Sequence, residues 1–292
     1  MNYNFLLDKE RYKDYDQSFS LDPDGDYKKS SYGNTNILSL THILNSRTFY
    51  QASLSYFFKQ YRQFVYENAS DARWTNSELL TQEPSDVPSF RTGGTRNEIF
   101  RRTTGTTGFK LDFTSQVTES HLVKTGIDVN LHQLTYNDVS LLQDDNLSNP
   151  QTTLQPFVHM RIPDKNDSNE NLSIDSYTRK PIELSAYIQD KIELKELIIN
   201  IGLRYDFFHP DGQILADPSD PDIYRPRKES NIAKTLDERR TYWYKKPSDK
   251  SQLSPRLGVA FPITDRGVIH FSYGYFFQIP NFEYLYQNQE YK

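Results

Sequence analysis

Residues 109–131 read FKLDFTSQVTESHLVKTGIDVNL, with apolar side chains at most odd positions and polar ones at most even positions. A period of two is typical of a β-strand, because successive side chains of a strand point to opposite faces of its sheet. The pattern is broken by Thr118-Glu119-Ser120, which leaves room only for a tight turn. The stretch therefore predicts a β-hairpin whose two strands share one apolar face.

The same alternation recurs in three further pairs of segments, which are 36–44 with 50–58, 182–192 with 197–207, and 257–261 with 269–277. Each pair is joined by a very short connection, namely Asn45-Ser46-Arg47, Lys195-Glu196 and Thr264-Asp265-Arg266. The four turn centres, near residues 46, 119, 195 and 265, are 73, 76 and 70 residues apart. We therefore expect eight strands in four hairpins, at about 36–66, 105–138, 180–209 and 251–280, with 1–35 as a loop or strand end.

The amino-acid composition excludes several classes of protein. The chain has 292 residues, of which 36% are hydrophobic and 14% aromatic, and its formal net charge is −5. So many aromatic residues argue against a disordered chain, and a net negative charge gives no electrostatic case for a nucleic-acid partner. The chain contains no cysteine, which excludes disulfides and thiolate chemistry. No apolar run is long enough for a transmembrane helix, but alternating strands average out to polar and still cross membranes.

Long polar stretches (67–104, 139–179 and 210–250) separate the hairpins, so that every short turn falls on one rim and every long loop on the other. Outer-membrane barrels have this asymmetry. Strands of about ten residues also suffice to cross a bilayer. Tyrosine and phenylalanine crowd the strand ends near the long loops, as an interfacial girdle requires (Tyr56, Phe57, Phe58, Tyr61; Tyr205, Phe207, Phe208; Tyr273, Tyr275, Phe276, Phe277).

These features favour an all-β, antiparallel up-and-down meander of about eight long strands that forms part of a transmembrane β-barrel in the cell outer membrane. Two alternatives stay open. A soluble or surface β-sandwich that binds carbohydrate through its loops would also alternate, with its apolar face turned inward. A complete eight-stranded outer-membrane barrel without a transport role is the other, since eight strands suffice for closure.

Two segments carry a family resemblance. Ala186-Tyr187-Ile188-Gln189-Asp190-Lys191, followed by Asn200-Ile201-Gly202-Leu203-Arg204-Tyr205-Asp206, is similar to a hairpin of the TonB-dependent outer-membrane receptors. Ser254-Pro255-Arg256-Leu257-Gly258, followed by His270-Phe271-Ser272-Tyr273-Gly274, resembles their next hairpin. Phe277-Gln278-Ile279-Pro280 is similar to the entry into the outer loop in members with an N-terminal carboxypeptidase-regulatory-like domain. These motifs cover about a third of the chain, which we expect to be a fragment, residues 1–292, from the middle of one barrel domain.

The resemblance implies transport rather than catalysis. Its members import a scarce nutrient of the siderophore, vitamin or glycan class. Their partners are the outer-membrane lipid, the small nutrient ligand, and an inner-membrane energy-coupling protein that is reached through an N-terminal plug. The stretches similar to the family include no plug, coupling box or closing strand, so the resemblance leads us to expect that transport belongs to a larger parent protein.

No catalytic motif is present, and we expect neither an enzyme nor a cofactor. Asp22, Asp24 and Asp26 alternate around a proline and a glycine, which makes them a weak calcium candidate against a solvated turn. Tyr242, Trp243 and Tyr244 are possible ligand-contacting aromatics of the third long loop, against a cluster that packs on its neighbours. The even strand faces predict a group of lumen-facing polar residues: Lys110, Asp112, Lys124, Asp128, Asn130, Arg204, Asp206, Arg256 and His270.

Three structural expectations follow. In the hairpin at 109–131, the three-residue turn and the charges both favour Lys110 opposite Asp128, with Asp112 opposite Gly126. The apolar faces point away from the concave side, so that Leu111, Ile127, Ile199, Ile201 and Val259 are largely exposed. The first and last strands, near 36–44 and 267–279, form open edges, which would make the isolated chain behave poorly in water.

Overall fold

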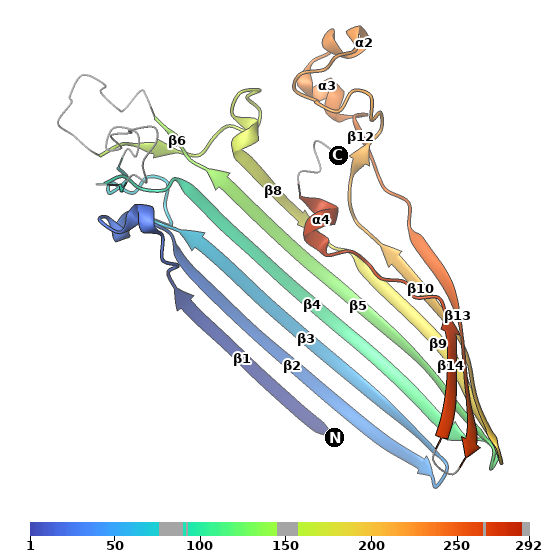
Figure 1. The fold of residues 1–292 in the computed structure, drawn as a ribbon. Coiled ribbons are helices and arrows are strands. Elements are labelled where there is room, and N and C mark those ends of the chain that lie inside the picture. Colours follow the sequence, from blue (N-terminus) through green and yellow to red (C-terminus); the bar gives the residue numbers. More distant parts are fainter. Residues whose placement is uncertain (76–89, 92, 145–156, 265–266, 288–292) are drawn as a thin grey trace.

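A computed structural model describes residues 1–75, 90–91, 93–144, 157–264 and 267–287. Its main feature is one ten-stranded antiparallel sheet. Nine of the strands lie side by side in the order β1-β2-β3-β4-β5-β9-β10-β13-β14, and the tenth, β8, pairs with β5 (Figure 1). The strands are β1 (Asn2–Tyr12), β2 (Lys28–Asn45), β3 (Thr48–Phe64), β4 (Glu98–Gln116), β5 (His121–Ser140), β8 (Ile174–Arg179), β9 (Ile182–Leu194), β10 (Leu197–His209), β13 (Lys250–Thr264) and β14 (Gly267–Gly274). The up-and-down meander is confirmed, and with it the all-β fold class.

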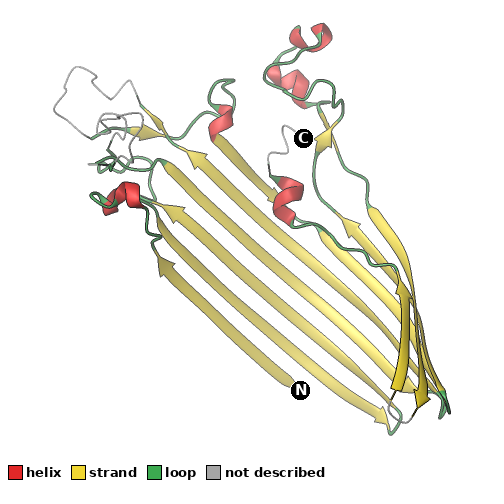
Figure 2. Cartoon of the chain, in the orientation of Figure 1, coloured by secondary structure: helices red, strands yellow, loops and turns green. Residues whose placement is uncertain are grey.

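The described segments outside this sheet, apart from the short turns, lie toward the long-loop rim (Figure 2). Two small two-stranded sheets stand there, β6 (Leu142–Gln143) with β7 (Met160–Arg161), and β11 (Ile214–Leu215) with β12 (Tyr244–Lys245). Short helices accompany them: α2 (Glu229–Ile232), α3 (Leu236–Arg240), α4 (Phe282–Tyr286) and the 3-10 turns Gln17–Phe19, Pro23–Gly25 and Asn171–Ser173. Within the described residues, no helix has the length and apolar character needed to cross a membrane.

The expected strands leave out two strands of the large sheet, as well as the four short strands of the two small sheets. Residues 2–12, expected as loop or strand end, form β1, which pairs with β2 from Asn2↔Ser39 to Tyr12↔Lys29. The open edges are therefore β1 and β14, and the expectation that 36–44 would be an edge is wrong. The second missed strand, β8, pairs with the upper end of β5, directly above β9.

The strands β8 and β9 pair with β5 in the same register. The residue numbers of paired positions, such as Leu134↔Arg179 and Leu131↔Ile182, add up to the same total in both ladders. Between them lies the fully buried Pro181, whose carbonyl accepts a hydrogen bond of 3.0 Å from the His132 backbone. Proline has no N–H to donate, so it interrupts a strand without shifting the register.

The predicted register of the second hairpin is confirmed: Lys110 faces Asp128 and Asp112 faces Gly126. The short turns lie at Ser46–Arg47, 117–120 and Lys195–Glu196, whereas Asp265 and Arg266 of the fourth expected turn lie outside the described residues. The ion pair of Lys110 is different from the one expected. Its ammonium contacts Asp112 two residues along the same strand, at 3.2 Å, instead of Asp128 across the ladder.

Paired residues of a ladder point to the same side, so the register assigns every strand residue to one of two faces. One face, here called the outer face, carries the odd residues of β4 and β5 and their partners. Ile127 (42% exposed) and Ile201 (53%) lie on it as predicted. Leu111, Ile199 and Val259 are half-buried instead, because neighbours on the same face cover one another.

The other face, the inner face, is the one over which α4 lies and toward which the sheet curls (Figure 1). The described residues contain no second large sheet packed on either face. The sandwich interpretation is therefore wrong, because nothing in the described chain turns the apolar face inward. The path from β1 to β14 is also open, so the ten strands do not form the small closed barrel.

Candidate functional site: an aromatic cavity under α4

A row of aromatic rings crosses the inner face near the long-loop rim. Tyr61 of β3 contacts Phe100 of β4 at 5.7 Å between centroids, and Phe100 contacts Tyr136 of β5 at 5.2 Å. Tyr136 stacks in parallel on Tyr177 of β8 at 5.0 Å. Alternation alone could not predict this row, since it depends on the pairing of four strands, of which only β4 and β5 are joined by a short turn.

The short helix α4 closes the row from above. Its Tyr286 lies 6.0 Å from Tyr177 and is buried, with its hydroxyl donating to the carbonyl of Pro210. Burial in this position raises the pKa of the Tyr286 phenol, so it stays a neutral donor. Phe282 of α4 packs edge-on against His132 at 4.9 Å and stacks on Phe208 of β10 at 6.5 Å. The chain after β14 therefore returns across the inner face instead of leaving the sheet.

His132, which contacts Phe282 at the start of α4, has partners on both of its ring nitrogens. Its Nδ1 lies 3.0 Å from Thr106 Oγ1 and its Nε2 lies 3.3 Å from Glu183 Oε1. With Phe282 over the ring, only 10% of the side chain stays exposed. The period of two assigns His132 to the polar face of its strand but indicates none of these partners.

A cavity of about 390 Å³ lies between α4 and the strands. Its walls combine aromatic rings, two cations, a carboxylate and small polar groups, chiefly from Phe57, Lys59, Tyr61, Arg102, Thr104, Leu134, Tyr136, Tyr177, Phe282 and Glu283. Ligand sites commonly have this make-up, mostly apolar and aromatic with a few polar groups that fix orientation. The cavity opens to the inner face, next to the long loops.

Electrostatically, the cavity has one paired and one unpaired cation. Arg102 Nη1 lies 3.1 Å from Glu283 Oε2, so this ion pair ties α4 to β4. Lys59 is exposed and has no carboxylate within ion-pair distance among the described residues. The cavity can thus offer a charged donor and flat ring faces to the same ligand.

The predicted lumen-facing residues all lie on inner-face positions of the ladder. The carboxylate of Asp112 accepts from the Tyr187 hydroxyl at 2.8 Å as well as contacting Lys110. Asn130 donates to Asp128 at 3.1 Å, and Arg204 pairs with Asp206 at 2.8 Å. The Arg256 guanidinium lies 5.0 Å from the ring of Phe276. Lys124 and His270 share the face but contact none of these groups, so the residues form separate pairs and not one site.

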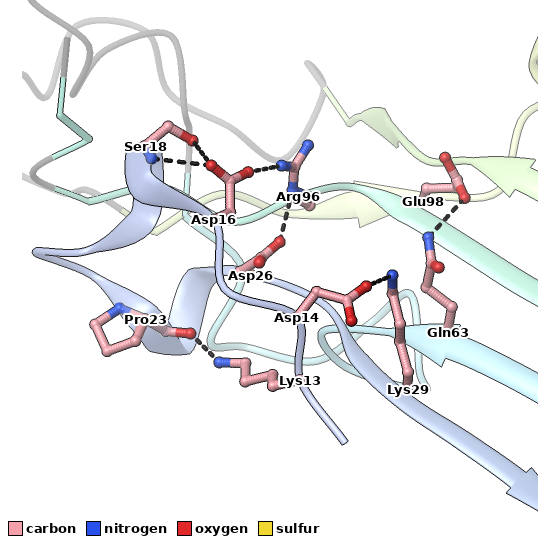
Figure 3. Close-up of polar contacts among 10 residues, drawn as sticks. All are labelled: Lys13, Asp14, Asp16, Ser18, Pro23, Asp26, Lys29, Gln63, Arg96 and Glu98. Atoms are coloured by element: carbon pink, nitrogen blue, oxygen red, sulfur yellow. Dashed lines mark hydrogen bonds and ion pairs between the residues drawn. The ribbon is translucent and has the colours of Figure 1, made fainter. Parts of the chain in front are cut away.

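The aspartates at 22, 24 and 26 do not gather as metal ligands. The carboxylate of Asp26 binds Arg96 Nε at 2.7 Å, and the other side of the same guanidinium binds Asp16 (Figure 3). Within the part of the chain that the structure describes, no group of three or more His, Asp or Glu side chains is placed to hold a metal ion. Asp16, Asp26 and Arg96 thus form an arginine-centred anchor between two loops.

Trp243 is not open to a ligand either, because it is only 4% exposed and packs with Leu215 and Ile223. Tyr244 packs against this cluster, whereas the hydroxyl of the more exposed Tyr242 donates to Asn231 at 2.9 Å. The aromatic residues 242–244 thus fit the alternative of a loop cluster that packs on its neighbours. For Trp243, the expectation that it contacts a ligand is corrected.

A profile of the outer membrane beta barrel domain family matches residues 2–292. The chain belongs to this family. This outer membrane barrel wall is also similar to a solved structure, the FrpB iron transporter from Neisseria meningitidis (F5-1 variant), with 15% identity and a TM-score of 0.45. The similarity covers 84% of this chain and 28% of that one, so the chain spans little more than a quarter of the transporter. No curated protein matches it.

Because the chain belongs to this barrel family, each face of the sheet can be assigned to lipid or to the lumen. The apolar outer face lies against lipid and the inner face lines the lumen, as in other outer-membrane barrels. In such barrels the short turns face the periplasm and the longer loops face outward. The aromatic cavity under α4 therefore lies on the lumen side at the external end of the wall.

Proposed function

We propose that this chain is part of the barrel of a TonB-dependent importer, which takes up a scarce nutrient of the siderophore, vitamin or glycan class with energy coupled from the inner membrane. The observation that carries the proposal is the aromatic cavity on the lumen side of the external rim. A ligand arriving from outside would meet it first.

The chemistry of the cavity suits this role. Ring faces such as those of Tyr61 and Tyr136 stack on sugars and on planar ligands alike, and they need little reorganisation because their neighbours already hold them. Lys59 adds a mobile cation for a carboxylate, phosphate or catecholate oxygen. Trp74 and Trp243 belong to separate loop clusters and do not line the cavity.

The signature hairpins support the importer type. Their residues Gln189, Gly202 and Arg256 come from three strands but lie in one row of the sheet. They surround a second hollow of about 440 Å³ on the inner face, together with Gly258, Ser272 and Gly274. Gln189, Gly202 and Arg256 of these motifs thus lie on the lumen-facing surface, where an importer would interact with its cargo and its plug.

The test is uptake by cells that carry the parent protein. Three labelled probes, a ferric siderophore, cobalamin and an oligosaccharide, would be compared with and without a protonophore. We expect energy-dependent uptake of one probe, and about a tenfold or larger loss of its binding in a Lys59→Gln/Tyr61→Ala variant, since stacking and a charged hydrogen bond each contribute about 1 kcal/mol or more.

Asn137→Ala is the matched control, because Asn137 lies on the outer face of β5 beside Tyr136. Uptake that ignores the protonophore would contradict energy coupling. Loss of binding in Asn137→Ala as large as in the cavity variant would contradict the assignment of the site.

A further inference from the structure

Four cations gather on the outer face of β1, β3 and β4, the face that lies against lipid. The register aligns Arg11 of β1, Arg62 of β3 and Arg101 of β4 in one row, with Ser30 of β2 between the first two. Lys9 lies two residues before Arg11 on the same face, opposite Tyr32. Cations on the lumen face, such as Lys59 and Arg102, belong to a different surface.

The row stands directly above the apolar band. Two residues below Lys9 comes Leu7, followed by Phe5, and both are more than half exposed on the same face. On the next strands Tyr32 and Phe58 contact each other edge-on at 6.2 Å. Two residues along a strand rise by about 7 Å, so the arginines lie roughly 14 Å above the level of Leu7 and Phe58. A tilt of about 45° makes this roughly 10 Å along the bilayer normal, which is enough to pass from the hydrocarbon into a headgroup region about 5–7 Å thick.

The patch contains a hollow of about 220 Å³. Lys9, Arg11 and Arg62 line it together with the hydroxyl and amide groups of Ser30, Tyr32 and Gln60. Glu10 reaches its edge from the opposite face of β1. Such a wall offers several N–H and O–H donors to an anion.

The charges of the patch are only partly neutralised. Glu67 bridges Arg62 at 3.1 Å and Arg101 at 2.9 Å. Lys9 and Arg11 are exposed, and among the described residues no carboxylate lies within ion-pair distance of either. The described surface is therefore left with positive charge at the level of the headgroups.

We propose that this patch binds the phosphate group of an outer-leaflet lipid headgroup, with the acyl chains of the same lipid on the apolar band below. The guanidinium fork matches phosphate oxygens, which makes arginine well suited to such headgroups. The hollow and the band are continuous on one face, which fits a lipid better than free phosphate. This site is separate from the importer cavity and does not depend on the transported ligand.

The experiment is a lipid titration of the purified parent protein that carries this chain, in a neutral detergent, followed by native mass spectrometry. The probes are monophosphoryl lipid A, the same glycolipid without its phosphate, and inorganic phosphate. We expect preferential retention of the phosphorylated lipid, weakened about fivefold for each cation removed in Lys9→Gln/Arg11→Gln. Arg62→Lys/Arg101→Lys keeps the charge but loses the fork, so it should fall between that variant and the unmodified protein.

Lys110→Gln/Lys124→Gln is the control, because it removes two cations from the inner face and should not change retention. Equal retention of the two glycolipids, or an equal loss in the control, would overturn the proposal. Binding of inorganic phosphate as tight as that of the lipid would point to a soluble anion and would also overturn it. Heat-modified migration in gels, checked for each variant, separates loss of binding from loss of fold.

Discussion

Asp190 stands on the apolar face of β9, where the alternation of the sequence predicts a hydrophobic residue. The structure supplies its partner: the carboxylate lies 2.7 Å from His121 Nδ1 at the start of β5. Both residues are near the short-turn rim, at the edge of the lipid band, where charged groups cost little. The register is needed to see this pair, because the two positions are 69 residues apart in the chain.

Gly126 is required by its neighbours on the inner face. A Cβ at this position would lie 2.6 Å from Asp112 Oδ1, 2.6 Å from Tyr187 Cε1 and 2.9 Å from the Leu111 carbonyl. We expect Gly126→Ala to separate the Tyr187–Asp112 hydrogen bond and to destabilise the fold by about 1–3 kcal/mol. Unfolding in detergent measures the loss.

Gly105→Ala provides the comparison within β4. The nearest atom to its added Cβ would be the Gln133 carbonyl oxygen at 3.9 Å, an ordinary contact. This variant should unfold close to the unmodified chain. If the two alanine variants were equally stable, crowding at Gly126 would not be the reason for its glycine.

The loop anchor around Arg96 gives a prediction at the scale of elements. Hydrogen bonds from Ser18 and the neighbouring Arg96 guanidinium hold the pKa of Asp16 below its ordinary value of 3.8. A carboxyl with a lowered folded pKa stabilises fully above its unfolded pKa, and this contribution is lost as the pH falls through the folded value. The β1–β2 loop should therefore loosen from the loop before β4 in acid.

Hydrogen exchange of residues 16–26 measures this, after correction for the intrinsic pH dependence of exchange. Protection should fall between about pH 4 and pH 2 in the unmodified chain. Asp16→Asn should show weaker protection at neutral pH and little further loss in acid. A loop whose protection were the same at both ends of this range would contradict the anchor.

The strand faces can be tested without removing any native thiol, because the chain contains no cysteine. Asn200 and Ile201 are neighbours in β10, but their partners Gly258 and Leu257 assign them to the inner and outer faces. In lipid vesicles, a cysteine at Asn200 should react with a membrane-impermeant maleimide at least tenfold faster than one at Ile201, since lipid excludes the reagent. Faster labelling at 201 would reverse the faces.

At this scale, much of the fold was predictable. A period of two and very short turns identify hairpins from local sequence, and the register at 109–131 followed from turn length and charge. The strands β1 and β8 were not predicted, and the reason is physical. Both carry polar and charged residues at many positions. The strand β8 lies above the lipid, and β1 alternates only weakly. Neither strand therefore shows the clear apolar-polar alternation by which the other strands were predicted.

The candidate site was less predictable than the fold. Its aromatic residues were visible only as part of a girdle, because their gathering depends on pairing among β3, β4, β5 and β8. The helix α4 follows a strand that has no local signal for turning back over the sheet. Individual side chains such as Trp243 satisfied the chemistry of a ligand site but were used by the loop for its own packing.

For the whole molecule, the wall is taller than the lipid it crosses. The strands β4 and β5 have 19 and 20 residues, about twice what a tilted strand needs to span a bilayer. Polar residues replace apolar ones on the outer face above Gly105 and Leu131. The upper half of these two strands therefore extends beyond the hydrocarbon, first to the level of the lipid headgroups and then into water.

Val129 and Asn137 of β5 test this height, since both are on the outer face and about 27 Å apart along the strand. With cysteine at each position in turn, we expect impermeant reagents to label position 137 on intact vesicles and to leave position 129 protected. Equal protection would place the whole of β5 within the lipid.

The hairpin plan also bears on how such walls evolve. Each hairpin begins and ends at the long-loop rim, so the duplication or deletion of one hairpin leaves every other strand with its direction and every loop on its own side of the membrane. Gain of a single strand would invert everything after it. The near-equal turn spacing in this chain fits growth by duplication of hairpins, after which the external loops were free to diverge while the short turns stayed short.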